Sequence, residues 1–228
     1  MLDYFFPRTC FLCSAAGDDL CVHCQQKLKV ICRGVFCTVC GKPFTAGLKP
    51  HPCSDCTKDP PAYDRHRSIF LFDENIKKLV HQFKYQGDFG IKRIIPEFFG
   101  AVAAEIPPAD IIIPVPLHVN RLRSRGYNQS LVLARVFGKL LCRKVGPRVL
   151  KRVKDTPTQT GLDRRQREQN LKKAFGISGK HDVGGKKILL VDDVHTTGVT
   201  LNAAASVLKS FGAGEVYALT LAFVPSGF

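Results

Sequence analysis

The sequence predicts an α/β protein with a parallel sheet, preceded by a small segment that depends on bound metal. From about residue 60 onward, short continuous apolar stretches alternate with helical patterns, which is typical of a parallel sheet covered on both faces. Before that point, eight of the ten cysteines form four Cys-x-x-Cys pairs. A chain of 228 residues holds one main core and a small appendage. We therefore expect domains at 1–60 and 61–228, joined by the proline-containing stretch "TKDPPAYDR".

The cysteine pairs predict structural zinc. A Cys-x-x-Cys turn directs two thiolates to one point, and two such turns complete the tetrahedral four-sulfur site that Zn²⁺ favours. A segment this small cannot bury a core of its own, so bound metal must supply much of its folding free energy. We expect two structural zinc ions, paired sequentially or in an interleaved order, and a redox role for the pairs is the competing interpretation. The expected ligands are Cys10, Cys13, Cys21, Cys24, Cys37, Cys40, Cys53 and Cys56.

The main domain is predicted as strands and helices in alternation. We expect strands at 67–72, 109–116, 186–194 and 215–224, and helices at 73–85, 129–141 and 201–211. The first helix is supported by Ile76, Leu79, Val80 and Phe83, which share one helical face, and by Asp73 as its cap. In such sheets, ligands bind beyond the carboxyl ends of the strands.

One stretch at such a strand end, "VDDVHTTGVT", combines acids with an anion cradle. The apolar residues before it predict a strand that ends at Val191, followed by Asp192 and Asp193 and then by a turn into a helix near Thr200. Backbone N–H groups at a helix N-terminus attract phosphate, and a glycine lets phosphate approach the backbone. The carboxylates would repel that phosphate, so they must address other groups of the same ligand, such as vicinal hydroxyls or a Mg²⁺ shell. The sequence therefore predicts a sugar phosphate ligand.

The longer stretch "ILLVDDVHTTGVTL" resembles the phosphoribosyl pyrophosphate (PRPP) signature of type I phosphoribosyltransferases. The resemblance implies that Asp192 and Asp193, the expected catalytic pair, hold the ribose 2′ and 3′ hydroxyls. It also implies that residues 194–200 hold the 5-phosphate and that Mg²⁺ accompanies PRPP. His195 departs from the signature, where a small residue is common, and we expect that it could reach the ligand. The PRPP-binding residues implied in this way are Asp192, Asp193, Val194, Thr196, Thr197, Gly198 and Thr200.

Two further segments narrow the resemblance. "PVPLHVNRLRSRGYNQS" and "LKRVKDTPTQTGLDRRQREQNLKKAF", joined to the cysteine pairs, are similar to the ComF family of competence-related proteins. That family implies a type I phosphoribosyltransferase fold with an N-terminal double zinc ribbon. It implies a pyrophosphate loop at Val115, Pro116 and Leu117, with Arg121, Arg125 and Asn128 beside it. It further implies a mobile flap that contains Arg152, Thr156, Gln159, Arg167 and Asn170, for which a solvated surface loop is the competing interpretation.

The charge of the chain favours anionic partners. The formal net charge is +15, and residues 111–154 contain eleven basic residues and no acidic one. A solvated basic face is the alternative. The family resemblance implies a role in natural transformation, with single-stranded DNA and the DNA-uptake machinery as expected partners. Tyr127 and Phe175 are candidates for stacking on bases.

We therefore expect a PRPP-binding protein of DNA uptake that also binds single-stranded DNA. The alternative is an active Mg²⁺-dependent phosphoribosyltransferase with an unidentified nitrogen acceptor. The sequence contains neither a signal-peptide pattern at its start nor an apolar stretch of about 18 to 20 residues. Accordingly, we expect no membrane insertion and a cytoplasmic location.

Overall fold

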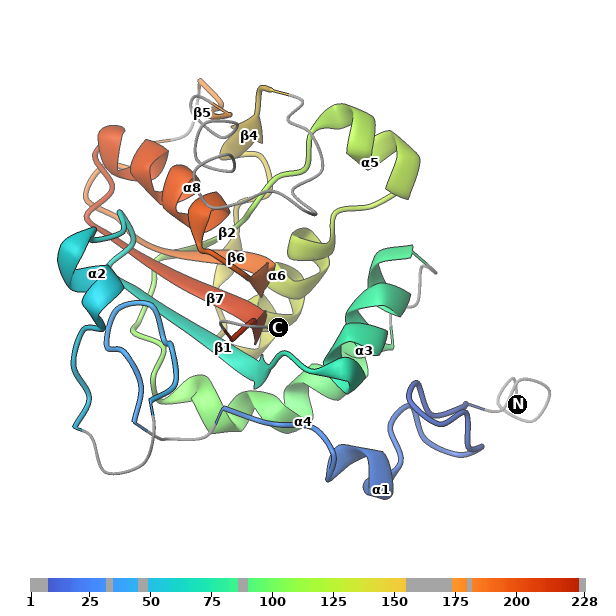
Figure 1. Cartoon of the computed structure of the whole chain (residues 1–228). Coiled ribbons are helices and arrows are strands. Elements are labelled where there is room, and N and C mark those ends of the chain that lie inside the picture. Colours follow the sequence, from blue (N-terminus) through green and yellow to red (C-terminus); the bar gives the residue numbers. More distant parts are fainter. Residues whose placement is uncertain are drawn as a thin grey trace.

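A five-stranded parallel sheet forms the centre of the main domain (Figure 1). The computed structural model describes residues 8–31, 35–44, 49–85, 90–154, 174–179 and 182–225. The strand order is β1-β7-β6-β2-β3, and every neighbouring pair is parallel. The predicted parallel sheet is therefore confirmed. The strands are β1 (Arg65–Leu71), β2 (Ile111–Pro114), β3 (Lys144–Val145), β6 (Lys187–His195) and β7 (Glu215–Phe223).

Helices cover both faces of this sheet, which explains why its strands read as unbroken apolar runs. On one face, α3 (Glu74–Tyr85), α4 (Ile91–Ala103) and α6 (Gln129–Leu140) pack around Leu189 and Val191. On the other face, α8 (Val199–Ser210) packs over Ile188 and Leu190 together with a small antiparallel pair, β4 (Leu150–Arg152) and β5 (Phe175–Ile177). Alternate residues of β6 thus belong to two separate cores.

The helix at 73–85 forms close to its predicted position. Asp73 caps it, because Oδ1 of that residue accepts hydrogen bonds from the backbone N–H groups of Asn75 and Ile76, both at 3.0 Å. Two other helices, α4 and α5 (Val119–Arg125), were not predicted. The first contains Pro96, which usually interrupts a helix, yet its buried residues recur at helical spacing. The second buries no residue at all, so it lacks the apolar periodicity that reveals a helix in a sequence.

The N-terminal segment forms two cysteine clusters, which contact different parts of the main domain. We call Cys10, Cys13, Cys21 and Cys24 the first cluster, and Cys37, Cys40, Cys53 and Cys56 the second cluster. A short helix begins inside the second cysteine pair of each cluster: α1 (Val22–Gln25) contains Cys24, and α2 (Ser54–Lys58) contains Cys56.

The first cluster and the residues next to it pack into the core of α3 and α4, through Cys10, Leu20, Cys24 and Leu28. The second cluster lies against β1, where the backbone N–H of His66 donates to the carbonyl of Val39 at 2.7 Å. The domain boundary near residue 60 stays a prediction. Among the described helices, none has both the length and the apolar character needed to cross a bilayer.

Candidate functional site

Asp192 and Asp193 lie inside β6, which runs to His195, one residue past the predicted stretch 186–194 and four residues past the expected end of its apolar part at Val191. The reason is that the two neighbours of β6 stop at different points. Pairing with β2 ends at Pro114 opposite Val191, whereas pairing with β7 continues to His195. The two acids are therefore fixed by one neighbouring strand, and the other neighbour has already turned away at their level.

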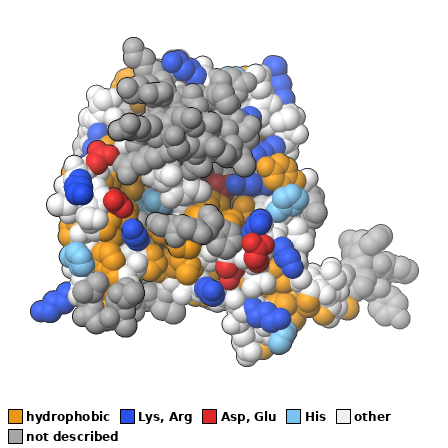
Figure 2. Space-filling view, viewed as in Figure 1, with side chains coloured by type: hydrophobic (Ala, Val, Ile, Leu, Met, Phe, Trp, Pro, Cys, Tyr) orange, Lys and Arg blue, Asp and Glu red, His pale blue; other side chains and the backbone are white. Residues whose placement is uncertain are grey.

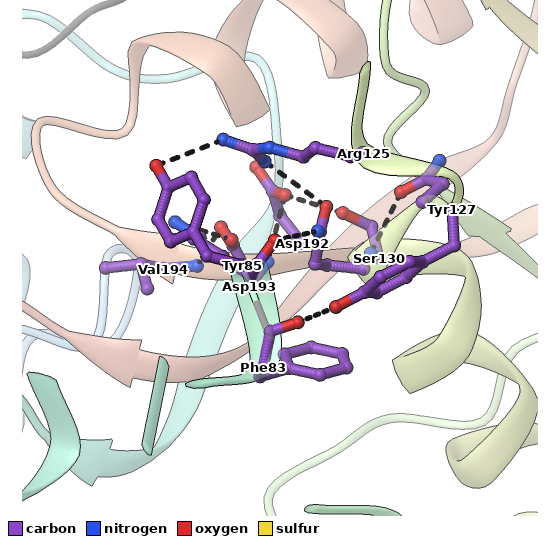
Figure 3. A network of polar contacts seen from close by, with 11 residues as sticks. Phe83, Tyr85, Arg125, Tyr127, Ser130, Asp192, Asp193 and Val194 are labelled. Atoms are coloured by element: carbon purple, nitrogen blue, oxygen red, sulfur yellow. Dashed lines mark hydrogen bonds and ion pairs between the residues drawn. The ribbon is translucent and has the colours of Figure 1, made fainter. Parts of the chain in front are cut away.

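The two carboxylates form a partly buried polar network with helices α3 and α6 (Figure 3). Oδ1 of Asp192 accepts from the hydroxyl of Ser130 at 2.8 Å and from the backbone N–H of Asp193 at 2.9 Å. Oδ2 of Asp193 lies 2.7 Å from Nζ of Lys84. Lys84 thus neutralises one acid, while the other is held by hydrogen bonds from a hydroxyl and a backbone amide.

This network shifts the ionisation of its members. Burial and, next to it, the adjacent charge of Asp193 raise the pKa of Asp192 to about 7, against the opposing hydrogen bond from Ser130. Burial by itself would lower the pKa of Lys84, but Asp193 outweighs that effect and raises it. A ligand that displaces the ammonium would therefore have to supply compensating donors or a cation.

The turn that follows β6 is shaped for an anion. Gly198 is the N-cap of α8 and has a left-handed backbone with φ of 74°, which favours glycine. The first turn of α8 presents backbone N–H groups that have no partner within the helix. Thr196 and Thr197 are exposed and Thr200 is half-buried, so hydroxyl groups surround the helix N-terminus. We call residues 196–200 the phosphate turn. These residues directly follow His195 at the end of β6, close to Asp193 and Val194, with which they were predicted to bind one ligand.

His195 lies beneath the phosphate turn, and the expectation that it could reach the ligand stays a prediction. Its side chain is buried, and its ring stacks between those of His66 and Phe223, with centroids 4.2 and 5.0 Å away. Nε2 of His195 lies 3.3 Å from the hydroxyl of Tyr63. Burial lowers the pKa of His195 to about 4, so the imidazole is neutral at physiological pH.

A cavity of about 250 Å³ separates the phosphate turn from the second cluster. Thr196, Thr197 and Gly198 line one side, and Cys40 and Cys56 line the other. Its remaining walls carry charged side chains from the N-terminal segment, namely Lys42, Asp55 and Asp59. The phosphate turn therefore borders open space on the side that faces the N-terminal segment.

The predicted pyrophosphate loop lies beside the acids. The backbone N–H of Val115 donates to the carbonyl of Val191 at 2.8 Å. Strand β2 stops pairing with β6 at Pro114, which lies opposite Val191, the residue before Asp192. Pro116 and Leu117 follow outside the sheet. Asn128 holds this loop, because its Nδ2 donates to the carbonyl of Val115 at 3.0 Å.

The basic residues predicted for this loop lie on α5, which projects from the body of the molecule (Figure 1). Arg125 ends that helix, and its guanidinium contacts the hydroxyl of Tyr85 at 3.4 Å and Oε1 of Gln129 at 3.3 Å. In Figure 3 it lies above the two acids. Arg121 occupies the preceding turn of the same helix.

The predicted flap is described only in part. Arg152 ends β4, and its guanidinium lies 5.6 Å from the ring centroid of Phe175 in the paired strand β5. The remaining flap residues, Thr156, Gln159, Arg167 and Asn170, lie outside the described residues.

Neither aromatic residue that was expected to stack on bases is placed to do so. Phe175 is buried and covered by Arg152. Tyr127 packs against the core and donates its hydroxyl to the carbonyl of Phe83. Both rings therefore pack against other parts of the protein. The prediction relied on residue type and on neighbouring basic charge, and neither distinguishes such packing from stacking on a base.

Both cysteine clusters fit a zinc ion, and they follow the sequential pairing. In each cluster the four sulfur atoms lie within 4.8 Å of one another. Sulfur–sulfur distances of 3.7 Å occur between Cys13 and Cys21 and between Cys40 and Cys53. A tetrahedron with metal–sulfur bonds of about 2.3 Å has edges of roughly 3.8 Å.

Backbone amides also favour the thiolate form of one cysteine in each cluster, Cys10 and Cys37. Burial alone would raise the pKa of Cys10, but donors from Cys21, Cys13 and Leu12 lower it to about 6. The backbone N–H groups of Cys53 and Cys40 point at the sulfur of Cys37, at 3.2 and 3.4 Å. Thiolates held in this way are suited to donate to a zinc ion.

Four residues of the site were not predicted from the sequence: Lys84, Ser130, Tyr63 and His66. Each acts through a partner more than 25 residues away in the chain, so no local pattern marks them. Only Lys84 gave a usable signal, since it lies at the end of a predicted helix that leads to the edge of the sheet.

Comparison with known proteins identifies both parts of the chain. Residues 1–57 match the double zinc ribbon domain, and residues 96–227 match the phosphoribosyl transferase domain. Over nearly its whole length the chain is 32% identical to Competence protein F of Haemophilus influenzae, covering 96% of this chain and 98% of that protein. The chain belongs to the ComF family.

Other ComF-like relatives have the same extent. DNA utilization protein YhgH of Salmonella typhi is 32% identical, with 92% of this chain and 94% of that protein covered. Competence protein ComFC of Bacillus subtilis is 27% identical, with 90% and 84% covered. The ComF family thus joins a double zinc ribbon to a phosphoribosyl transferase domain in one chain, as the two cysteine clusters and the parallel sheet of this protein do.

Proposed function

We propose that this chain binds PRPP, or a related ribose 5-phosphate ligand, through Asp192, Asp193 and the phosphate turn. The observation that carries the proposal is their arrangement: two carboxylates beyond the last pairing of β2, followed at once by a left-handed Gly198 at the start of α8. Acids suit the ribose diol, and backbone N–H groups suit the 5-phosphate. Membership of the phosphoribosyl transferase family supports the same ligand.

The pyrophosphate of PRPP would lie against the loop of Val115, Pro116 and Leu117. That loop leaves β2 beside the acids, and Arg125 adds positive charge nearby. Mg²⁺ takes oxygen ligands and would supply charge neutralisation between the pyrophosphate and the ribose hydroxyls. The donor set of this site, two adjacent carboxylates, is compatible with that ion. Lys84 would shift from Asp193 or share it with the ligand.

A titration of PRPP into the protein tests this proposal. With Mg²⁺ present, we expect saturable binding by calorimetry, and we expect Asp193→Asn to weaken it at least about tenfold because a charged acceptor is lost. Glu74→Gln is the matched control, since that carboxylate is exposed on α3 and pairs only with Lys77 among the described contacts. Absence of PRPP uptake by the zinc-loaded protein would reject the proposal.

Single-stranded DNA is the second ligand that we propose, and α5 is the candidate surface. This helix carries Arg121, Arg123 and Arg125 and exposes the apolar side chains of Val119 and Leu122. Cations beside exposed apolar groups suit a backbone of phosphates with unstacked bases. Basic side chains are also scattered over the face in Figure 2. The names of the relatives, which refer to competence and DNA utilization, agree with such a role.

Salt dependence tests DNA binding. We expect the affinity for a short single strand to fall steeply with salt, and Arg123→Ala to lower both the affinity and the slope of that dependence by about one unit of released counterion. Lys77→Ala on α3 serves as a control, because it removes one exposed charge elsewhere. Binding that is indifferent to salt would count against the proposal.

Turnover is the alternative function. A pyrophosphate loop placed beside the acids favours it, since only a pyrophosphorylated ribose would fill both. In that reaction a nitrogen lone pair would form the bond to C1, the bond from C1 to the pyrophosphate oxygen would break, and pyrophosphate would leave with that electron pair. Release of pyrophosphate from PRPP with a panel of amines and nucleobases, abolished by Asp193→Asn, would establish it. No release across the panel would leave binding as the function.

A further inference from the structure

The underside of the phosphate turn is built from residues that the second cluster holds in place. Nδ1 of His66 lies 2.7 Å from the carbonyl oxygen of Cys40, which is one of the expected zinc ligands. The backbone N–H of the same histidine donates to Val39 at 2.7 Å. Gly41 rests directly on the strand, because a Cβ there would come within 2.8 Å of the carbonyl oxygen of His66. The second cluster therefore fixes the start of β1 by three close contacts.

His66 connects the second cluster to the phosphate turn. Its ring stacks on that of His195 at 4.2 Å, and His195 supports Gly198 from below. A Cβ at Gly198 would lie 2.8 Å from Nε2 of His195 and 3.2 Å from the hydroxyl of Tyr63, so the turn rests on both side chains. The side chains of His66, His195 and Tyr63 are all buried.

The linker adds a second attachment at the same place. The backbone N–H of Ala62 donates to Oδ1 of Asn202 in the first turn of α8, at 2.6 Å. Tyr63, the next residue, supplies the hydroxyl beneath Gly198. The chain that leaves the second cluster therefore reaches the N-terminus of α8 before it enters β1.

The first cluster makes none of these contacts in the described part of the chain. It packs on α3 and α4 instead, where Gln82 of α3 donates to the carbonyl of Phe11 at 3.1 Å and Arg93 of α4 pairs with Asp19. The protein thus contains two similar metal sites, of which one is attached to the phosphate turn and the other is not. This difference gives an internal control.

We propose that zinc in the second cluster holds the phosphate turn in its anion-binding conformation, with His66, His195 and Tyr63 as positioning residues. This inference rests on the proposed function for the identity of the ligand. Because coupling between two sites is reciprocal, a ligand on the turn also retains zinc in the second cluster. The first cluster is not coupled to the turn.

Hydrogen–deuterium exchange tests the coupling without any ligand. Cys53→Ser removes a ligand of the second cluster, and Cys13→Ser removes one of the first, so each variant keeps a single zinc. We expect amide exchange in residues 196–202 to become at least about fivefold faster in Cys53→Ser. In Cys13→Ser it should remain at the wild-type rate. Equal exchange in the two variants, after metal analysis confirms the losses, would overturn the inference.

A second measurement uses ribose 5-phosphate as the probe. Saturating probe should slow chelator-driven zinc release from Cys13→Ser, whose remaining ion is in the second cluster, and leave release from Cys53→Ser unchanged. His195→Ala in the Cys13→Ser background keeps the metal ligands and should abolish the slowing. If wild-type protein fails to bind the probe while exchange follows the expected pattern, the proposed ligand is wrong and the coupling stands. If the probe binds but retains neither ion, the coupling is wrong.

Discussion

Asp192 and Asp193 are adjacent in sequence but differ in surroundings, and the difference has a consequence for pH. Asp193 is paired with Lys84, whereas Asp192 is held by neutral donors and has a pKa raised to about 7. An acid whose pKa is raised in the folded state stabilises the fold fully only at low pH. That contribution is lost as pH rises from the unfolded value near 4 through about 7.

The first prediction follows from that sign. Asp192→Asn, which resembles the protonated acid, should make the ligand-free protein more stable than wild type at pH 8, by about 2 to 4 kcal/mol, with little difference at pH 4. Urea unfolding at the two pH values measures this. Glu74→Gln, on the exposed surface of α3, should produce no such pH-dependent gap. A constant difference between wild type and Asp192→Asn would contradict the raised pKa.

The second prediction concerns Gly198. Replacement by Ala forces a side chain into a left-handed backbone and against Nε2 of His195, so we expect a loss of about 1 to 3 kcal/mol in stability and of phosphate binding. Gly100→Ala is the matched control, because α4 has open space at that position. That change should stabilise the protein by about 0.5 to 1 kcal/mol. Calorimetry and thermal unfolding of both variants distinguish the effects.

At the scale of elements, Asn128 joins a helix to the loop beside the acids. Its Oδ1 accepts from the backbone N–H of Ser130 at 2.9 Å, which caps α6, and its Nδ2 donates to the carbonyl of Val115 at 3.0 Å. The carbonyl oxygen of this side chain therefore caps the helix, and its amino group holds the loop.

The third prediction separates these tasks. Asn128→Ala should cost about 1 to 2 kcal/mol in unfolding free energy, since the cap and the bond to the loop are both lost. Asn128→Asp keeps an accepting oxygen for the cap but has no donor for Val115, so it should retain most of the stability while PRPP binds more weakly. Urea unfolding and ligand titration report the two effects. Equal losses of stability in both variants would show that the cap is not the main contribution.

Elements with apolar periodicity were predictable from the sequence, except α4, in which Pro96 interrupts an otherwise helical pattern, and elements without it were not. The buried strands and α3 carry patterns that follow directly from their packing, and Asp73 marks the start of the helix. By contrast, α5 buries no residue, and nothing in its composition separates a helix from a loop. The Asp192–Asp193 pair and the Thr-rich turn were found from their chemistry. Their partners Lys84 and Ser130 were not, because tertiary folding alone brings them there.

At the scale of the whole molecule, the cysteine clusters are part of the structure of the main domain. The first shares a core with α3 and α4, and the second lies against β1. Loss of metal should therefore affect more than the N-terminal segment, because apolar contacts with the helices depend on a folded cluster.

The fourth prediction tests that dependence. The protein should contain two zinc ions per chain, and Cys10→Ser should contain one and lose more than about 2 kcal/mol of stability, since buried packing on α3 and α4 is disturbed. Cys142→Ser is the control, because that thiol is exposed and belongs to neither cluster. It should keep both ions and its stability. Metal analysis with urea unfolding decides; an unchanged zinc content in Cys10→Ser would contradict the assignment.

The early departure of β2 from the sheet leaves the backbone of the acids paired on one side only. Because β7 alone pairs with the backbone of Asp192 and Val194, the segment between Val115 and Asn128 can differ in length as long as Ser130 still reaches Asp192. The geometry of the acid pair can thus stay constant while the arginine-bearing segment beside it varies.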